Sequence, residues 1–250
     1  AESTLDLSAP LCLRVDNTIA ALQQIARFWR RKLDLRVIGI TGSNGKTIVK
    51  EWLYQLMRED KNIVRSPKSF NSQVGVPLSL WQLSKEHDMG IFEAGISLPQ
   101  EMHLLETIIQ PTIGLITNIG SAHDENFENQ KQKVTEKIKL FINAEILIYS
   151  KDYSLIHETL TADKRFGNVA VFTWSRKLRA DLLIGRITKT NTDCEIQGIY
   201  KNEFIRITIP FTDEASIENA IHCWAMMLYL GYENKVIADR MKFLSPVAMR

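Results

Sequence analysis

A short polar stretch, residues 42–47, combines the side chains and the backbone flexibility that bind nucleotide phosphates. It reads Gly42, Ser43, Asn44, Gly45, Lys46 and Thr47. Glycines let successive backbone N–H groups point at one anion, and a helix that follows adds its positive N-terminal end. Lys46 would reach the terminal phosphates, and the Thr47 hydroxyl would hold a magnesium ion. The residue types and their spacing therefore predict a nucleotide-phosphate loop, in preference to an ordinary strand–helix turn.

The segments on either side of this loop are those that a phosphate loop requires. The apolar run from Arg36 to Ile40 predicts a buried strand. Apolar residues then recur at helical spacing at Ile48, Val49, Trp52, Leu53, Leu56 and Met57. The loop departs from the common form G-x-x-x-x-G-K-S/T, which needs glycine at position 40, where this chain has Ile40. It has the shorter form G-x-x-G-K-T.

Two further candidates follow strand-like runs, at the positions where ligands bind in doubly wound parallel sheets. Glu93 ends the run that starts at Gly90, and a carboxylate there could hold magnesium. The alternative is a glutamate that caps the next turn. His123 follows the next strand exit, and the residues alone leave open whether it belongs to the site or is structural or exposed. Structural or exposed roles are predicted for the other histidines, His87, His103, His157 and His222.

Lys137 falls on the apolar side of a predicted helix, residues 130–143. Its neighbours on that side are Val134, Ile138, Leu140 and Phe141. Glu136 and Lys139 are expected to point away from it. A lysine among buried residues needs a partner or a chemical role. The alternative is that its aliphatic stem is buried while its ammonium reaches water, and the residues alone leave both interpretations open.

Strand-like runs alternate with helical patterns through most of the chain. The runs are 36–40, 62–65, 90–94, 112–118, 146–149 and 169–174, and the helical patterns are 19–31, 48–57, 77–83, 99–108, 130–143 and 153–161. This alternation predicts an α/β fold with a doubly wound, mostly parallel sheet that is covered on both faces. The short runs 182–188, 194–200 and 204–209 predict a small antiparallel β meander appended to that core. Two helices, 216–230 and 234–243, end the chain.

The overall composition is that of a soluble globular protein and excludes several other classes. The chain has 250 residues, 45% hydrophobic and 24% charged, and its net charge of +2 indicates neither a nucleic-acid nor a membrane surface. Its three cysteines, Cys12, Cys194 and Cys223, have no C-x-x-C spacing, which argues against a zinc site or a disulfide framework. The longest apolar stretch, 220–230, is too short to span a bilayer. A cytoplasmic location is expected.

Three segments together resemble the Mur ligase family, the ATP-dependent enzymes that build the peptide of bacterial peptidoglycan. They are Thr41–Thr47, Asn71–Pro77 and Thr117–His123, and the short phosphate loop is this family's own form. Residues 17–26 resemble, within the family, the ligases that add D-alanyl-D-alanine to UDP-N-acetylmuramoyl-tripeptide. The resemblance implies ATP and Mg²⁺ as cofactors. It also implies that an acyl phosphate forms on the substrate carboxylate and that the incoming amine then attacks it.

The resemblance implies a role for each matching residue. The nucleotide would be bound by Gly42, Ser43, Asn44, Gly45, Lys46, Thr47, Asn118, Asn219 and Arg250. Magnesium would be held by Thr47, Glu93, His123 and Lys137, with Lys137 carbamylated, and the catalytic residues would be Lys46, His123 and Lys137. The muramoyl peptide would be contacted by Asn71 and Ser72. The chain departs from the family at Ala215-Ser216, which replaces the usual His-Asn pair that precedes the adenine-site asparagine.

Members of this family have three domains, and this chain is expected to hold one of them. Residues 1–17 would be the tail of an N-terminal uridine-binding domain, and residues 18–250 the central ATP-binding domain, with the C-terminal domain absent. The missing domains are therefore expected partners, and a fused alanine racemase, known in some bacteria, stays open. A chain of this extent is expected to be inactive alone. Two alternatives remain, another amide ligase of the same build, such as folylpolyglutamate synthetase, and a nucleotide-binding module without catalysis of its own.

Overall fold

The chain forms one nine-stranded sheet, described in this computed structural model for residues 14–120 and 126–248. The strands are β1 (Arg36–Thr41), β2 (Ile63–Arg65), β3 (Met89–Glu93), β4 (Ile113–Ile116), β5 (Ile146–Ser150), β6 (Ala170–Ser175), β7 (Leu182–Lys189), β8 (Cys194–Tyr200) and β9 (Glu203–Ile209). Their spatial order is β2-β3-β1-β4-β5-β6-β7-β8-β9. Neighbours from β2 to β7 run parallel, whereas β8 is antiparallel to both β7 and β9.

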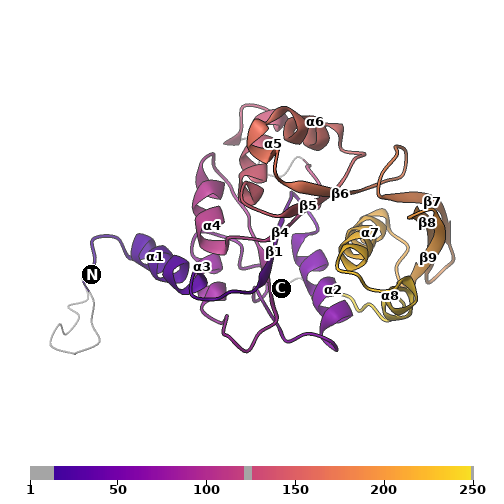
Figure 1. Ribbon diagram of the computed structural model, residues 1–250, viewed down its shortest axis with the longest axis horizontal. Coiled ribbons are helices and arrows are strands. Elements are labelled where there is room, and N and C mark those ends of the chain that lie inside the picture. Colours follow the sequence, from indigo (N-terminus) through magenta and orange to yellow (C-terminus); the bar gives the residue numbers. More distant parts are fainter. Residues whose placement is uncertain (1–13, 121–125, 249–250) are drawn as a thin grey trace.

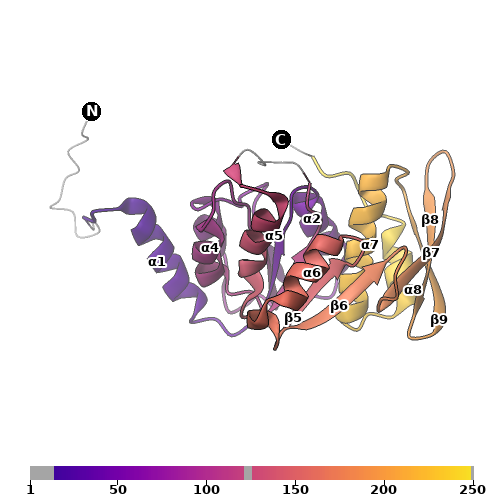
Figure 2. The ribbon, with the colours of Figure 1, turned by 90° about the horizontal axis from the view of Figure 1, so that it is seen from above.

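Helices connect the strands and cover both faces of the sheet (Figure 1). They are α1 (Thr18–Arg30), α2 (Lys46–Met57), α3 (Gly75–Leu80), α4 (Glu101–Ile109), α5 (Gln130–Ile138), α6 (Ser154–Ala162), α7 (Glu214–Tyr229) and α8 (Asn234–Met241), with 3-10 turns η2 (Lys139–Phe141) and η3 (Lys164–Phe166). Figure 2 shows α1 at one end of the molecule and β7–β9 at the other. Among the described residues, no helix is long and apolar enough to cross a lipid bilayer.

The two faces of the sheet bury separate hydrophobic clusters. Helices α2, α7 and α8 contribute to one cluster, and α3, α4, α5 and α6 contribute to the other. Successive residues of β1 point to opposite faces, so Ile38 and Ile40 belong to the first cluster and Val37 belongs to the second. The central strand is therefore covered on both sides, as a parallel sheet requires. This arrangement fixes the end of β1, where the phosphate loop begins.

The predicted α/β fold with its antiparallel meander is confirmed, and the structure shows how the meander is attached. Strand β7 pairs in parallel with β6, with Trp174 opposite Leu182, so the meander β7–β9 continues the parallel sheet. Helices α7 and α8 lie between α2 and this antiparallel end (Figure 1). The helix expected at 130–143 is also divided, because α5 ends at Ile138 and the chain continues as the 3-10 turn η2.

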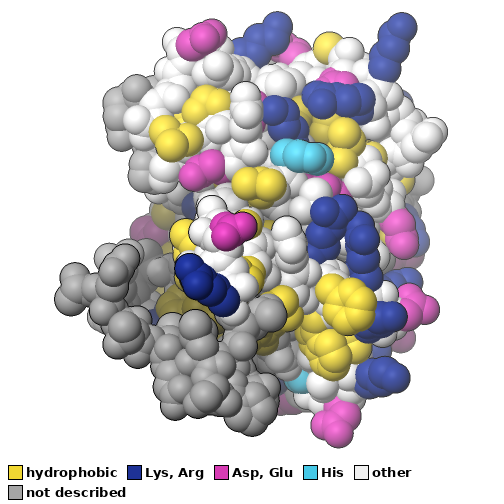
Figure 3. All heavy atoms as spheres, turned by 90° about the vertical axis from the view of Figure 1, so that its left-hand side faces the viewer, with side chains coloured by type: hydrophobic (Ala, Val, Ile, Leu, Met, Phe, Trp, Pro, Cys, Tyr) yellow, Lys and Arg dark blue, Asp and Glu magenta, His cyan; other side chains and the backbone are white. Residues whose placement is uncertain are grey.

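Helix α1 packs against α3 and α4 at one end of the sheet. Asn17 caps its N-terminus, where the Asn17 side-chain oxygen accepts a hydrogen bond from the Ala20 N–H at 2.9 Å. Its outer side leaves Phe28 62% exposed. Figure 3 shows this side of the molecule, where apolar and basic side chains are mixed. Most of the predicted domain tail at 1–17 lies outside the described residues, so that domain boundary stays a prediction.

Candidate nucleotide-binding site

The turn between β1 and α2 needs both of its glycines. Gly42 has a φ of +145° and Gly45 a φ of +81°, in the region that disfavours side chains. A Cβ atom on Gly42 would lie 2.0 Å from the hydroxyl oxygen of Thr117, and one on Gly45 would lie 2.2 Å from the Asn219 side-chain oxygen. The loop is therefore wedged between the end of β4 and helix α7, which holds its backbone close to both.

Asn118, just beyond β4, braces the loop from the side. Its backbone oxygen accepts from Ser43 N at 2.9 Å, and its side-chain oxygen accepts from Asn44 N at 3.0 Å. These two amides are thus directed at Asn118 and not at an anion. The amides at the start of α2, which include those of Lys46 and Thr47, have no carbonyl partner within the helix, so they are the ones suited to phosphate oxygens.

Three lysine side chains converge beside this loop. The ammonium of Lys46 donates to Gly42 O at 2.9 Å and to Ser43 O at 3.2 Å. Lys137 donates to the same Gly42 oxygen at 3.2 Å, and Lys133 donates to Gly120 O at 2.6 Å. Burial, together with the nearby charges of Lys46 and Lys133, lowers the pKa of Lys137 to about 7. Such a concentration of positive charge suits a polyphosphate.

Glu93 lies fully buried at the end of β3, next to α2. Its Oε2 accepts a hydrogen bond from the Thr47 hydroxyl at 3.0 Å, and its Oε1 lies 3.1 Å from the Lys50 ammonium. Lys50, also fully buried, donates to the backbone oxygens of Ser66 and Lys68 as well. The predicted metal carboxylate is therefore held by two residues of α2, one turn apart.

These side chains fit a magnesium ion in the nature of their donors. Magnesium prefers hard oxygen ligands, and Thr47 and Glu93 present a hydroxyl and a carboxylate in contact with each other. Over residues 14–120 and 126–248, no three His, Cys, Asp or Glu side chains gather closely enough to form a metal site by themselves. The predicted ligand His123 and the predicted nucleotide residue Arg250 lie outside the described residues.

Two cavities open beside the loop, and Ser43, Lys46 and Asn71 line both of them. The first has a volume of about 350 Å³ and includes Ser72 and Lys137 in its wall. The second has a volume of about 470 Å³ and is lined by Thr47, Asn118, Ala215, Glu218 and Asn219, among others. The predicted site residues thus form two groups on either side of Lys46. One group lines the cavity next to the predicted peptide-contacting segment, and the other lines the cavity next to α7.

The predicted peptide-contacting segment is attached to the end of β3. The backbone oxygen of Asn71 accepts from Gly95 N at 2.8 Å, and the Ser72 hydroxyl oxygen accepts from Gly75 N at 3.2 Å, at the start of α3. Lys50 holds the beginning of this segment through Ser66 and Lys68. The segment and the metal carboxylate therefore share one buried support.

A buried histidine supports the strand exit that carries Asn118. The Nδ1 atom of His222 accepts from the Trp174 indole N–H at 3.1 Å, so its Nε2 carries the proton and donates to Thr117 O at 2.7 Å. Burial lowers the pKa of His222 to about 4. The structural role predicted for this histidine agrees with these contacts.

The structure corrects one expectation and adds two lysines. Glu136 was expected to point away from the apolar side of its helix, yet it is buried and accepts a hydrogen bond from Gln100 N at 2.8 Å. Lys50 and Lys133 were not identified from the sequence. Lys133 lies one helical turn before Lys137, so the spacing itself could have placed both on one face.

Comparison with known proteins agrees with this geometry. A family model described as the Mur ligase middle domain matches residues 40–227, which include the phosphate loop, Glu93, Lys137 and Asn219. The chain belongs to the Mur ligase family. Its match begins within β1 and ends within α7, so it contains every strand of the sheet beyond the first residues of β1.

Similar Mur ligases include several that carry one enzyme name. UDP-N-acetylmuramoyl-tripeptide–D-alanyl-D-alanine ligase of Treponema pallidum is 29% identical over 238 residues, which is 94% of this chain and 50% of that protein. The enzyme of the same name from Borreliella burgdorferi is 31% identical over 91% of this chain and 48% of its own length. The chain therefore spans about half the length of these curated relatives.

Solved Mur ligase structures share the fold. MurF from Acinetobacter baumannii superposes with a TM-score of 0.84 at 24% identity, over 94% of this chain and 52% of that one. MurF from Thermotoga maritima in complex with ADP also gives 0.84, at 19% identity, over 96% of this chain and 56% of its own. At these identities the likeness establishes the architecture alone.

Proposed function

We propose that this chain forms the ATP-binding centre of a cytoplasmic ligase that joins D-alanyl-D-alanine to UDP-N-acetylmuramoyl-tripeptide. The enzyme name shared by its relatives supports the substrates. The observation that carries the proposal is the position of Lys46, whose side chain lines two cavities at once. A ligase of this kind must bring a nucleotide and a carboxylate substrate together at the terminal phosphate, and Lys46 stands where such ligands would meet.

The chain's own residues account for the phosphate chemistry. Lys46 and the first amides of α2 would hold the terminal phosphates, while Lys133 adds positive charge nearby. Thr47 and Glu93 would hold magnesium, which would neutralise the phosphate charge when bound. Asn71 and Ser72 would orient the muramoyl peptide in the first cavity. The reaction needs no protein nucleophile, because the substrate carboxylate attacks phosphorus and the amine then attacks the acyl phosphate.

We also propose that Lys137 is carbamylated. A neutral amine adds to carbon dioxide and loses a proton, which leaves a carbamate anion. The lowered pKa of Lys137 supplies the neutral amine near physiological pH, and Lys46 would stabilise the product anion. In this proposal His123 would hold a second magnesium ion together with the carbamate. Arg250 would contribute to nucleotide binding at the link to a further domain.

The test measures phosphate release and ligated product with ATP, magnesium, UDP-N-acetylmuramoyl-tripeptide and D-alanyl-D-alanine. It is run on this chain and on the complete polypeptide that its gene encodes. We expect product from the complete polypeptide and nucleotide binding alone from the 250-residue chain, because positioning all reactants supplies much of such a rate acceleration. A complete polypeptide that ligates a folate substrate, or that binds ATP without forming any amide, would overturn the proposal.

A further inference from the structure

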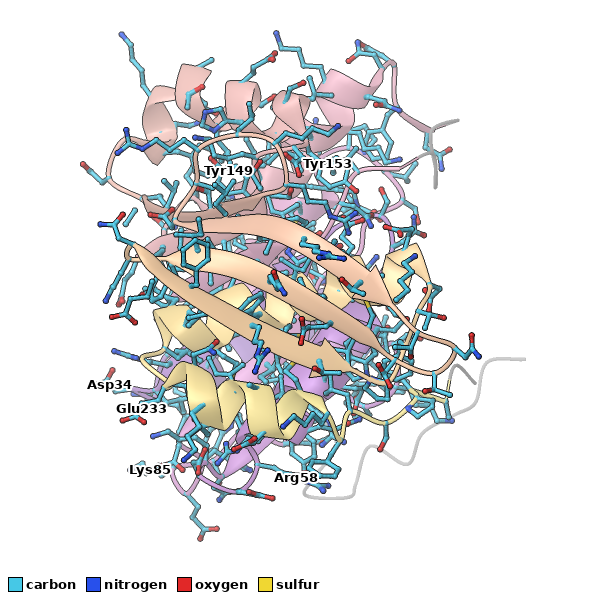
Figure 4. All side chains as sticks on the ribbon, turned by 90° about the vertical axis from the view of Figure 1, so that its right-hand side faces the viewer. Asp34, Arg58, Lys85, Tyr149, Tyr153 and Glu233 are labelled. Atoms are coloured by element: carbon cyan, nitrogen blue, oxygen red, sulfur yellow. The ribbon has the colours of Figure 1, made fainter. Side chains whose placement is uncertain are left out.

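Glu218 places a carboxylate on the wall of the second cavity, and the proposed function gives this residue no role. It lies on the second turn of α7, next to Asn219, and is partly buried. Its Oε1 accepts a hydrogen bond from the Tyr153 hydroxyl at 2.7 Å. Tyr153 comes from the turn between β5 and α6 and is labelled in Figure 4. The tyrosine, at the start of α6, therefore holds one carboxylate oxygen of Glu218 on α7 in place.

Among the described residues, Glu218 forms no ion pair with a lysine or arginine; the charge of Arg176, which pairs with Glu214, acts on it only from a distance. The His222 ring lies 3.9 Å from its Oε1 and is neutral, because burial lowers the pKa of His222 to about 4. Within the described residues, its Oε2 receives no hydrogen bond. Glu214 lies one turn earlier on the same helix and is exposed. Each of its carboxylate oxygens has a cationic partner, Arg176 at 3.0 Å and Lys189 at 2.6 Å.

The position of the phosphate loop decides which part of a nucleotide would reach Glu218. Lys137, whose proposed carbamate would help to hold magnesium at the terminal phosphates, lines the first cavity, whereas Lys46 lines both. A nucleoside attached to those phosphates would then leave the loop through the second cavity. A carboxylate accepts hydrogen bonds only and repels phosphate, so it favours the nucleoside end, which carries N–H and O–H donors.

We infer that Glu218 is a specificity-determining residue that accepts a hydrogen bond from the nucleoside of bound ATP, with Tyr153 holding its carboxylate in place. The shared chemistry is a single N–H or O–H donor, either the 6-amino group of adenine or a ribose hydroxyl. This inference rests on the proposed ATP-binding function and adds a nucleoside contact to it. It also gives the site an acceptor on the helix where the chain lacks the family's usual His-Asn pair.

The test compares dissociation constants by calorimetry in the presence of magnesium. The ligands are ATP, 2′-deoxy-ATP, purine riboside triphosphate, which lacks the 6-amino group, and inorganic tripolyphosphate. The variants are Glu218→Met, Tyr153→Phe and the matched control Glu214→Met. We expect Glu218→Met to weaken ATP binding about 10- to 100-fold, the range of a hydrogen bond to a charged group. Tripolyphosphate binding should be unchanged, which also reports that the variant is folded.

The analogues identify the donor. Weak binding of purine riboside triphosphate to the unsubstituted chain, with no further loss in Glu218→Met, assigns the 6-amino group. The same pattern with 2′-deoxy-ATP assigns the 2′-hydroxyl. Tyr153→Phe should give a smaller loss with the same ligand pattern, and Glu214→Met should change nothing. Equal losses for ATP and tripolyphosphate, or unchanged ATP binding in Glu218→Met, would overturn the inference alone. Failure of the unsubstituted chain to bind any nucleotide would overturn the proposed function as well.

Discussion

The Lys50 ammonium lies 3.1 Å from Glu93 Oε1, and neither side chain has any exposed surface. Lys50 also donates to the backbone oxygens of Ser66 and Lys68, so its donors join helix α2, strand β3 and the segment that follows β2. A buried ion pair of this kind contributes little net stability compared with apolar residues, but loss of one partner leaves a buried charge uncompensated. Its value here lies in fixing the carboxylate that faces Thr47.

Replacement of Lys50 by methionine should therefore destabilise the fold strongly. The variant leaves the Glu93 carboxylate buried with Thr47 as its remaining partner, which should cost about 3–5 kcal/mol in the free energy of unfolding. The double variant Lys50→Met, Glu93→Gln removes both charges and should recover most of that loss. Urea denaturation followed by circular dichroism measures both. If the single and double variants unfold at the same urea concentration, the unpaired charge of Glu93 is not the cause of the lost stability.

His222 should make stability depend on pH. Its pKa is about 4 in the folded chain, below the ordinary value of 6.5, so the unfolded chain binds the extra proton between these values. The stability that the neutral histidine contributes is complete above pH 6.5 and falls by about 3 kcal/mol as the pH approaches 4. Between pH 7.5 and pH 5, urea midpoints should report about 2 kcal/mol of this loss. His222→Gln should show a smaller drop between the two pH values, and an equal drop would exclude the histidine as its source.

The sequence predicted the site residues that lie close together along the chain. It did not predict those whose roles depend on contacts with distant segments. The glycines, Lys46 and Thr47 lie within six consecutive positions, so their spacing alone indicated a phosphate loop. Lys137 was found because its helical neighbours are apolar. Lys50 gave no such signal, since its acceptors come from residues 16 to 43 positions away. The parallel pairing of β7 with β6 was likewise hidden, because strand pairing between separate segments leaves no local pattern.

Lys46→Ala should remove most nucleotide affinity without unfolding the chain. In the described part of the chain, its ammonium hydrogen-bonds to two backbone oxygens of the loop, Gly42 O and Ser43 O, so little packing is lost with it. Its charged hydrogen bonds to phosphate should be worth about 10- to 100-fold in the dissociation constant. Calorimetry with ATP and magnesium measures this, and thermal melting checks the fold. Lys139→Ala is the control, because Lys139 pairs with Glu136 instead of reaching the loop; similar losses in both variants would contradict a specific role for Lys46.

Lys137 should react as a neutral amine at a pH where other lysines do not. Burial, and then the charges of Lys46 and Lys133, lower its pKa from 10.5 to about 7, so its neutral fraction rises through pH 7 and dominates by pH 8. Competitive acetylation across pH 6 to 9, read by mass spectrometry, should show its relative reactivity levelling off above pH 8, while exposed lysines still gain with pH. Under ¹³C-labelled carbon dioxide, a carbamate signal should appear at pH 8, weaken at pH 6 and vanish in Lys137→Ala. A reactivity that tracks the exposed lysines would show that its amine is not perturbed. A carbamate signal that persists in Lys137→Ala would place the modification on another lysine.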